Sequence, residues 1–312
     1  MNEILNVDCL EWLRTRAANS LHAVCTDPPY GLVEFSSKEV AKLRSGKGGV
    51  WRLPPEFDGK KRNPLPRFSI LTLDQKIALE KYFEQWATLL LPALVPGAHV
   101  LVASNTILHP HVFLGLLNAG LEPRGTMMRV YHGFRGGDRP KNAEKEFPDI
   151  CVSPRGNYEP WLLFRKPISE KTVAQNLRKW GFGALRMLEG GRPVPDVIPS
   201  SKTPANEKEI ANHPSLKPQH LLRFFCRMLT PNPGTLLDPF MGSGSTIAAC
   251  EAIGINSIGL EIDQEYFAQA KSVIPMLAGL YPHYKGCQID FETVPATKVD
   301  SSQLLMFEKS GK

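Results

Sequence analysis

The segment Thr235–Thr246 constrains the fold more than any other part of the chain. Its residues, Thr-Leu-Leu-Asp-Pro-Phe-Met-Gly-Ser-Gly-Ser-Thr, are those of an apolar strand, a glycine turn and the start of a helix. Gly242 and Gly244 allow the backbone to approach a ligand closely, and Ser245 or Thr246 stands near the helix cap. A strand that passes through such a turn into a helix is typical of ligand-binding α/β sheets. We therefore predict an α/β fold with a ligand at this turn.

An acidic residue follows at a spacing that supports a ligand over a bare turn. The next strand ends in Gly-Leu-Glu-Ile-Asp, and Glu261 lies 23 residues after Asp238. In nucleotide-binding units a carboxylate near this spacing accepts ribose hydroxyls. The loop lacks the Gly-Lys-Ser/Thr of a phosphate-binding loop and the full Gly-x-Gly-x-x-Gly of a dinucleotide site. It instead resembles the S-adenosyl-L-methionine (AdoMet) site of methyltransferases.

A second motif, Asp27-Pro-Pro-Tyr30, follows the strand 23–26. The prolines fix the backbone and hold the Pro28 carbonyl outward, while Pro29 keeps the turn rigid. Asp27 and that carbonyl can accept both hydrogens of an exocyclic amine, which localises the lone pair of its nitrogen. Tyr30 offers a face on which a flipped base can stack. Alone, the tetrapeptide also fits an ordinary proline turn; with the glycine loop, one motif binds the methyl donor and the other the acceptor.

Composition bounds these hypotheses without deciding them. The net charge of +6 is compatible with a polyanionic partner. The six cysteines form no Cys-x-x-Cys pair, so we expect reduced thiols and no metal site. The N-terminus has no basic region followed by an apolar run, and no stretch is long enough to span a bilayer. We expect a soluble cytoplasmic protein.

Apolar periodicity and turn residues predict the remaining elements. Besides the strand 235–238, we expect strands at 4–7, 23–26, 99–103, 126–131, 150–153, 161–165 and 257–261, and helices at 9–16, 73–91, 111–119, 219–229 and 246–253. The stretch 34–68 is an irregular basic insertion, and 168–212 is rich in Pro, Gly and charge. We interpret the latter as a small separate lobe.

Taken in order, these motifs resemble those of the β-class DNA amino-methyltransferases, which methylate adenine N6 or cytosine N4. In that family the catalytic tetrapeptide precedes the cofactor loop, as it does here. His213-Pro-Ser-Leu-Lys-Pro218 resembles the family motif that closes over AdoMet, and Asn6-Val-Asp-Cys-Leu-Glu11 the opening motif. Val7 stands where many relatives carry Gly. The cofactor-binding residues implied are Asp8, Lys217, Asp238, Phe240, Gly242, Ser243, Gly244, Ser245, Thr246 and Glu261.

The resemblance implies an AdoMet-dependent, Rossmann-like methyltransferase fold: a twisted, mostly parallel sheet with flanking helices, in permuted motif order. The domains expected are a catalytic half (1–167), a target-recognition lobe (168–212), an AdoMet-binding half (213–295) and a tail (296–312). Methyl transfer is expected as direct in-line displacement on a flipped base, with Asp27 as acceptor of the amine's hydrogen bond. Methylation at cytosine C5 is disfavoured, since no cysteine follows a proline.

Alternatives within and beyond the family stay open at this point. Cytosine N4 is the nearest rival, but its enzymes more often carry Ser before Pro-Pro, so Asp27 favours adenine N6. Protein glutamine methyltransferases use a related tetrapeptide, with the cofactor loop placed first. A non-catalytic DNA-binding regulator that kept the fold is opposed by the intact Asp27, Gly242 and Gly244.

Double-stranded DNA is the expected partner, with a homodimer and a companion restriction endonuclease as further expectations. The two basic loops and the lobe offer cations for phosphates and base edges. The candidates are Lys47, Arg52, Lys60, Lys61 and Arg62 in the first loop, Arg135 and Arg139 in the second, and Arg178 and Arg186 in the lobe. The recognised DNA sequence is left open.

Overall fold

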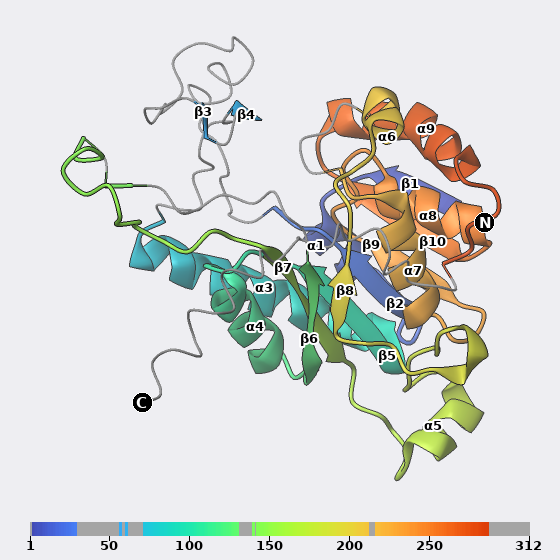
Figure 1. The fold of residues 1–312 in the computed structure, drawn as a ribbon. Coiled ribbons are helices and arrows are strands. Elements are labelled where there is room, and N and C mark those ends of the chain that lie inside the picture. Colours follow the sequence, from blue (N-terminus) through green and yellow to red (C-terminus); the bar gives the residue numbers. More distant parts are fainter. Residues whose placement is uncertain are drawn as a thin grey trace, which may run out of the picture.

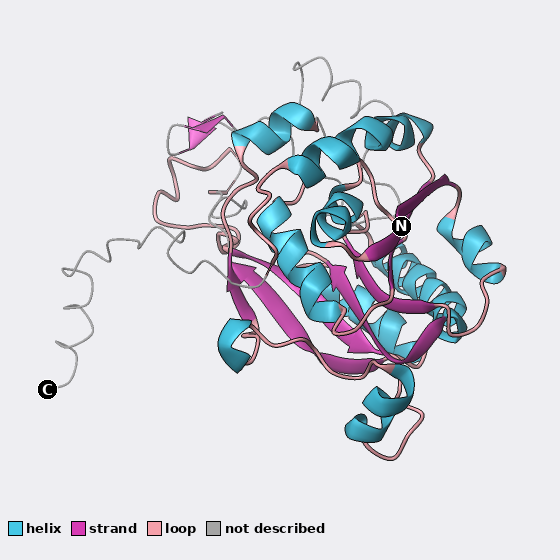
Figure 2. Ribbon diagram, turned by 90° about the vertical axis from the view of Figure 1, so that its right-hand side faces the viewer, coloured by secondary structure: helices cyan, strands magenta, loops and turns pink. Residues whose placement is uncertain are grey.

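The computed structural model describes residues 2–29, 56–57, 60–61, 71–130, 139–140, 142–211 and 216–286. Within them one eight-stranded sheet forms the centre of the molecule, with helices on both of its faces (Figure 1 and Figure 2). In order across the sheet the strands are β1 (Asn2–Asn6), β10 (Asn256–Glu261), β9 (Thr235–Asp238), β2 (Leu21–Thr26), β5 (Leu94–Ala103), β7 (Tyr158–Arg165), β6 (Glu122–Val130) and β8 (Val197–Pro199).

All strands of this sheet run parallel except one. The five from β1 to β5 pair in parallel, β7 is antiparallel to both β5 and β6, and β8 is parallel to β6. Two strands from late in the chain, β10 and β9, are thus inserted between the early strands β1 and β2. A separate antiparallel pair joins β3 (Glu56–Phe57) and β4 (Lys60–Lys61). This confirms the predicted fold class, a mostly parallel sheet flanked by helices.

Two helical layers cover the sheet because side chains alternate along each strand. On β2, Val24 packs with α1 (Cys9–Arg14), α3 (Leu73–Ala93) and α4 (His109–Asn118). Its neighbours Ala23 and Cys25 pack with α7 (Gln219–Leu229) and α8 (Ser245–Ile253). A third cluster joins α8 to α9 (Gln264–Gly279). The sheet is thus buried on both faces, and its strand ends remain for a site.

Most predicted elements are present within a few residues of their expected ends, and α7 and β9 have the predicted bounds. Helix α3 begins at a capping box, in which Thr72 and Gln75 each bond the other's backbone N–H. Helix α9 was not predicted. It begins after Asp263, whose side chain accepts hydrogen bonds from the N–H groups of Glu265 and Tyr266.

The predicted strand at 150–153 is wrong. These residues form no strand, and Ile150 and Val152 are 53% and 66% exposed. Apolar residues alone do not make a strand; they need a neighbouring strand with which to pair. The outer edge of β6 is occupied instead by β8, with Met128 opposite Val197.

The interpretation of 168–212 as a separate lobe also needs correction. Strand β8 extends the main sheet, and Phe182 and Ile198 lie in its core clusters. The segment also carries α5 (Val173–Trp180), a 3-10 turn (Glu189–Gly191) and α6 (Ala205–Ile210). Asn176 of α5 is fully buried and donates to the carbonyls of Pro96 and Phe182. A role of this segment in target recognition stays a prediction, while the basic insertion 34–68 and the tail 296–312 lie largely or wholly outside the described residues.

Across the part of the chain that the structure describes, each helix is too short or too polar to cross a membrane.

Candidate active site

The two motifs meet at one edge of the sheet. Strands β2 and β9 are parallel neighbours, with Val24 opposite Leu237. Asp27, which follows β2, and Asp238, which ends β9, therefore lie at the carboxyl ends of adjacent strands. The Thr26 hydroxyl donates to Asp238 Oδ1 over 2.7 Å, a buried bond between residues 212 positions apart in the chain. In open α/β sheets this edge is where ligands bind. The predicted donor and acceptor motifs are therefore brought together.

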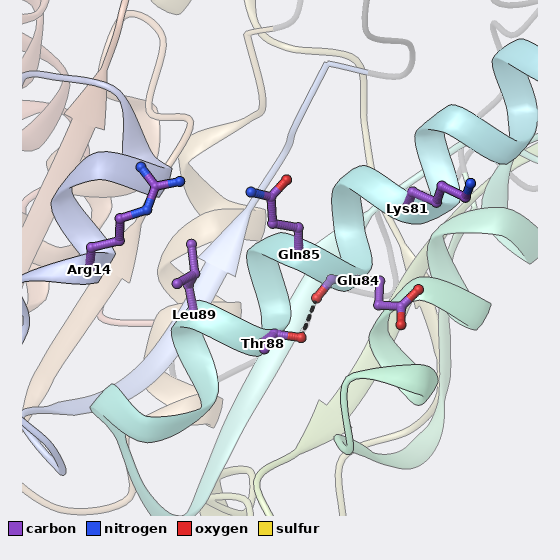
Figure 3. A pocket seen from close by; sticks show the side chains of 6 residues that line it. All are labelled: Arg14, Lys81, Glu84, Gln85, Thr88 and Leu89. Atoms are coloured by element: carbon purple, nitrogen blue, oxygen red, sulfur yellow. Dashed lines mark hydrogen bonds between the residues drawn. The ribbon is translucent and has the colours of Figure 1, made fainter.

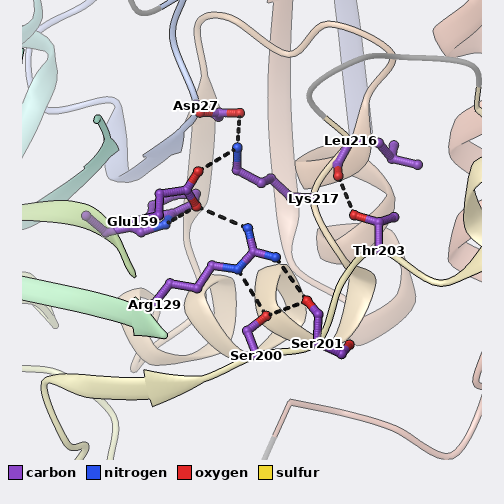
Figure 4. A network of polar contacts seen from close by, with 9 residues as sticks. Asp27, Arg129, Glu159, Ser200, Ser201, Thr203, Leu216 and Lys217 are labelled. Carbon is purple, nitrogen blue, oxygen red and sulfur yellow. Dashed lines mark hydrogen bonds and ion pairs between the residues drawn. The ribbon is translucent and has the colours of Figure 1, made fainter. Parts of the chain in front are cut away.

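Asp27 is held by a lysine. The Lys217 ammonium donates to Asp27 Oδ2 over 2.6 Å and forms a second ion pair with Glu159 Oε1 at 3.1 Å (Figure 4). Burial lowers the pKa of Lys217, but the carboxylates of Asp27 and Glu159 outweigh it, so the pKa is raised. Lys217 therefore stays charged. Pro28 is buried and Pro29 exposed, whereas Tyr30 lies outside the described residues, and its stacking role stays a prediction.

The pair continues into a buried network on the neighbouring strands. Glu159 Oε2 accepts from Arg129 at 3.1 Å and from the Trp161 indole at 3.0 Å. Arg129 also donates to the Ser200 hydroxyl and the Ser201 carbonyl, which follow β8. Sequence reasoning missed Glu159 and Arg129. Each is a charged residue within a predicted strand or just before one, and charged residues are rarely buried unless they are paired. That pattern could have marked them.

The glycine loop folds back on its predicted acidic partner. Glu261 Oε2 accepts from the Gly242 N–H at 2.9 Å, and its Oε1 accepts from the Asp263 N–H at 2.8 Å. Burial raises the pKa of Glu261. Gly244 has φ +89°, and a Cβ there would lie 2.5 Å from Ile274 Cγ1. The second glycine is thus required both by its backbone conformation and by the packing of α9.

Asp238 is buried at the centre of the loop. Burial raises its pKa to about 6, and hydrogen bonds from Thr246, Thr26 and the Phe240 N–H limit the rise. Ser243, Ser245 and Thr246 are buried, and the Ser245 carbonyl accepts from Gln219. These contacts hold the loop against α7 and β2.

Two further predicted cofactor residues flank the loop. The Phe240 ring centroid lies 6.0 Å from that of Trp86, which anchors it to α3. Asp8 follows β1 and caps α1, accepting from the N–H groups of Leu10 and Glu11 at 2.8 and 3.0 Å. Because Asn6 pairs with Glu261 in the sheet, Asp8 lies just beyond the same edge. At this edge the buried Asp238 and the half-buried Asp8 and Glu261 suit a ligand with hydroxyl donors and positive charge, as AdoMet has.

The predicted DNA contacts fare unevenly. Arg139 and Arg178 are exposed, but α5 packs through Asn176 on Pro96, at the amino end of β5, so Arg178 lies at the edge opposite Asp27. Arg186 is committed to the carbonyls of Thr230 and Pro231, which precede β9. Their positions do not support these two arginines as readers of bases beside a flipped one. Lys47, Arg52, Arg62 and Arg135 lie outside the described residues, as do the side chains of Lys60 and Lys61.

A groove between α1 and α3 lies away from both motifs. It is lined by Arg14, Lys81, Glu84, Gln85, Thr88 and Leu89 (Figure 3). None of these residues was predicted to bind the cofactor or the base. The strand ends remain the candidate site.

Comparison with known proteins agrees with this geometry. The family model described as DNA methylase matches residues 21–272, from β2 into α9. The chain is 39% identical over 260 residues to the Type II methyltransferase M.MjaI of Methanocaldococcus jannaschii, covering 78% of this chain and 82% of that protein. With the Type II methyltransferase M.HindIII of Haemophilus influenzae it shares 23% identity over 282 residues, or 83% and 90% of the two chains. The solved PvuII DNA methyltransferase (cytosine-N4-specific) has the same fold, with a TM-score of 0.56 at 16% identity, covering 89% and 91%.

Proposed function

The chain belongs to this family of DNA methylases, of the N6/N4 class, and we propose that it methylates the exocyclic N6 amine of adenine in double-stranded DNA, with AdoMet as methyl donor. One observation carries the proposal: Asp27, paired with the Lys217 ammonium, shares a sheet edge with the glycine loop. A carboxylate acceptor beside a cofactor loop is what transfer to an amine requires.

On the acceptor side, Asp27 and the Pro28 carbonyl accept hydrogen bonds from the two N–H groups of the amine. An ionised carboxylate is too weak a base to deprotonate a neutral aromatic amine, because its pKa lies far below that of the amine. Asp27 acts instead as a hydrogen-bond acceptor while positive charge develops on the nitrogen, and it takes the proton that the alkylated nitrogen loses. The adjacent Lys217 keeps it in the anionic form that both tasks need.

On the donor side, the chain's carboxylates and glycine loop hold the cofactor. Bound AdoMet supplies an electrophilic methyl group on a sulfonium centre. Glu261 offers carboxylate oxygens to ribose hydroxyls, Asp238 adds negative charge beneath the loop, and Asp8 lies near the adenine. Gly242 and Gly244 both have positive φ, the backbone conformation that this turn requires and that glycine adopts without strain.

Adenine is preferred to cytosine on one residue. Enzymes of the N4 type more often carry Ser before Pro-Pro, and this chain carries Asp27. The fold does not decide between the two, since the cytosine-N4-specific PvuII enzyme has it too. Methylation of cytosine N4 is therefore the second candidate.

The product separates these candidates directly. DNA is incubated with the protein and methyl-labelled AdoMet, digested to nucleosides and resolved by chromatography with mass detection. We expect label in N6-methyldeoxyadenosine; label confined to N4-methyldeoxycytidine would replace adenine by cytosine. Long-read sequencing of DNA from cells that express the protein then reports the modified base with its sequence context. A homodimer and a companion restriction endonuclease stay predictions.

A further inference from the structure

Four charged side chains of alternating sign lie in line behind the predicted acceptor motif. Asp27 contacts Lys217 at 2.6 Å, Lys217 contacts Glu159 at 3.1 Å, and Glu159 contacts Arg129 at 3.1 Å (Figure 4). Their side chains are 16%, 9%, 5% and 5% exposed. The formal charges sum to zero, so the cluster is neutral while every member is ionised. The inner pair, Glu159 and Arg129, was not among the predicted site residues.

Stability alone does not explain such a cluster. Removing several charges from water is costly, and well-packed apolar residues of similar volume are often as stabilising. Arg129 lies on β6 and Glu159 on β7. At the other end of these two strands there is a single ion pair, in which Arg165 contacts Glu122 at 2.6 Å and the Glu122 side chain is 39% exposed. One partly solvated pair is enough to link β6 and β7 there. The buried cluster at the carboxyl edge therefore calls for a different reason.

The bonding of Glu159 supplies that reason. Its Oε2 is fixed by Arg129 and Trp161, which leaves Oε1 to receive the Lys217 ammonium. A lysine ammonium has three donors on a flexible stem, so a second carboxylate decides where it rests. Arg129 is itself held by Ser200 and Ser201, and Thr203 of the same segment donates to the carbonyl of Leu216, beside Lys217 (Figure 4).

We propose that Glu159 is a positioning residue for methyl transfer: it shares the Lys217 ammonium with Asp27, fixes where that ammonium rests, and thereby orients the Asp27 carboxylate toward the target amine. The inference rests on the proposed function. Without the Glu159 charge, two cations face one carboxylate, and the ammonium competes with the amine for the same lone pairs. The segment after β8 then serves the acceptor site by bracing Arg129.

Other charges face Asp27 and enter any pH profile. Lys217 precedes α7, and Glu159 and Arg129 come from β7 and β6. Asp238 ends β9, and its pKa is raised by the Asp27 charge among other causes. Losing the Lys217 charge disfavours ionised Asp27, so the acid limb of activity moves to higher pH. Losing the Glu159 charge removes a like charge and produces no such upward shift.

The test compares two carboxylate-to-amide changes on one strand pair. Glu159→Gln is set against Glu122→Gln, which removes the Arg165 partner at the far end of β6 and β7. For each variant, kcat, KM for DNA and the dissociation constant of AdoMet are measured between pH 5 and 9, with urea unfolding alongside. We expect Glu159→Gln to lower kcat about 10²-fold, with AdoMet affinity within about twofold and no upward shift of the acid limb. Lys217→Gln should lower kcat and shift that limb, and Glu122→Gln should keep the wild-type kcat.

Equal kcat values for Glu159→Gln and Glu122→Gln would overturn the inference, as would a loss that appears only in AdoMet binding. If Glu159→Gln does not fold, Glu159→Asp decides, because it keeps the charge and shortens the reach by one methylene. An unchanged kcat in a folded Glu159→Asp variant also overturns the inference. Total labelled methyl is scored whatever the base, so the result does not depend on adenine. A wild-type protein that methylates no DNA defeats the proposed function itself, a separate outcome.

Discussion

The two halves of the site hold their carboxylates by different means. At the end of β2, Asp27 is paired with an ammonium that is itself clamped by Glu159. At the ends of β9 and β10, the described donors to Asp238 and Glu261 are hydroxyls and backbone N–H groups, all neutral. The acceptor half carries its counter-charge within the chain. The donor half leaves negative charge for a cationic ligand to complement.

The largest test of this division is removal of the acceptor. We expect Asp27→Ala to lower kcat by about 10² to 10⁴-fold, because the amine loses its charged hydrogen-bond acceptor. AdoMet affinity should change little, since that site is built from the other half. Labelled methyl transfer and equilibrium binding of AdoMet measure the two separately. A variant with full activity would remove Asp27 from the mechanism.

In the donor half, protonation of Asp238 should make both the stability of the protein and its affinity for AdoMet depend on pH. Asp238 has a pKa of about 6 in the folded chain against 3.8 as the ordinary value, so the folded state holds its proton more tightly. Its contribution to stability is present at low pH and is lost as pH rises from about 4 to 6, by roughly 3 kcal/mol. Urea unfolding without cofactor, compared with Asp238→Asn, isolates this difference. AdoMet affinity should run the other way and rise over the same window; a flat difference would contradict the burial argument.

A second test of the donor half weakens the contact between Glu261 and the glycine loop. Glu261→Gln places an amide N–H opposite one of two backbone N–H groups, so either the Gly242 or the Asp263 contact is lost. We expect AdoMet to bind about 10- to 100-fold more weakly, the size of one charged hydrogen bond. The exposed Glu209→Gln controls for charge. If kcat at saturating AdoMet fell as far as affinity, the two halves would not be separable.

The smallest effect is expected where the halves touch. Thr26→Val removes the hydroxyl that bonds Asp238, while Thr246 and the Phe240 N–H still serve that carboxylate. The free energy of unfolding should fall by about 1 kcal/mol. Thr26→Ser keeps the hydroxyl and should recover most of this stability in urea unfolding. Equal stability of the Val and Ser variants would show that the bond contributes nothing.

Local signals predicted the parts of the fold that local chemistry determines. The bounds of α7 and β9 follow from apolar spacing and the flanking proline and glycine. The glycine loop and its acidic partner followed from spacing along one strand-helix-strand unit. Asp27 and its prolines were visible because they are contiguous.

Non-local pairing decided the rest, and single-residue patterns do not report it. Strand β8 has three residues and exists because β6 offers it an edge, whereas the apolar run at 150–153 has no such neighbour. Lys217 was predicted beside the cofactor, yet its neighbours in the sequence do not reveal that it forms an ion pair with Glu159 of β7. Arg178 stands in a basic stretch, and only the direction of β5 shows that it lies at the sheet edge opposite Asp27.

The insertion of two late strands between early strands of the sheet has a consequence for biosynthesis. During synthesis β1 and β2 emerge long before β10 and β9, the strands with which they pair in the finished sheet. Until those later strands arrive, the nascent chain carries Asp27 on an incomplete sheet whose open edges invite mispairing. A chain severed between α6 and α7 would separate the tetrapeptide from the glycine loop, so neither fragment has a complete site. Methylation therefore requires that β9 and β10, the last two strands of the described residues, have been inserted into the sheet.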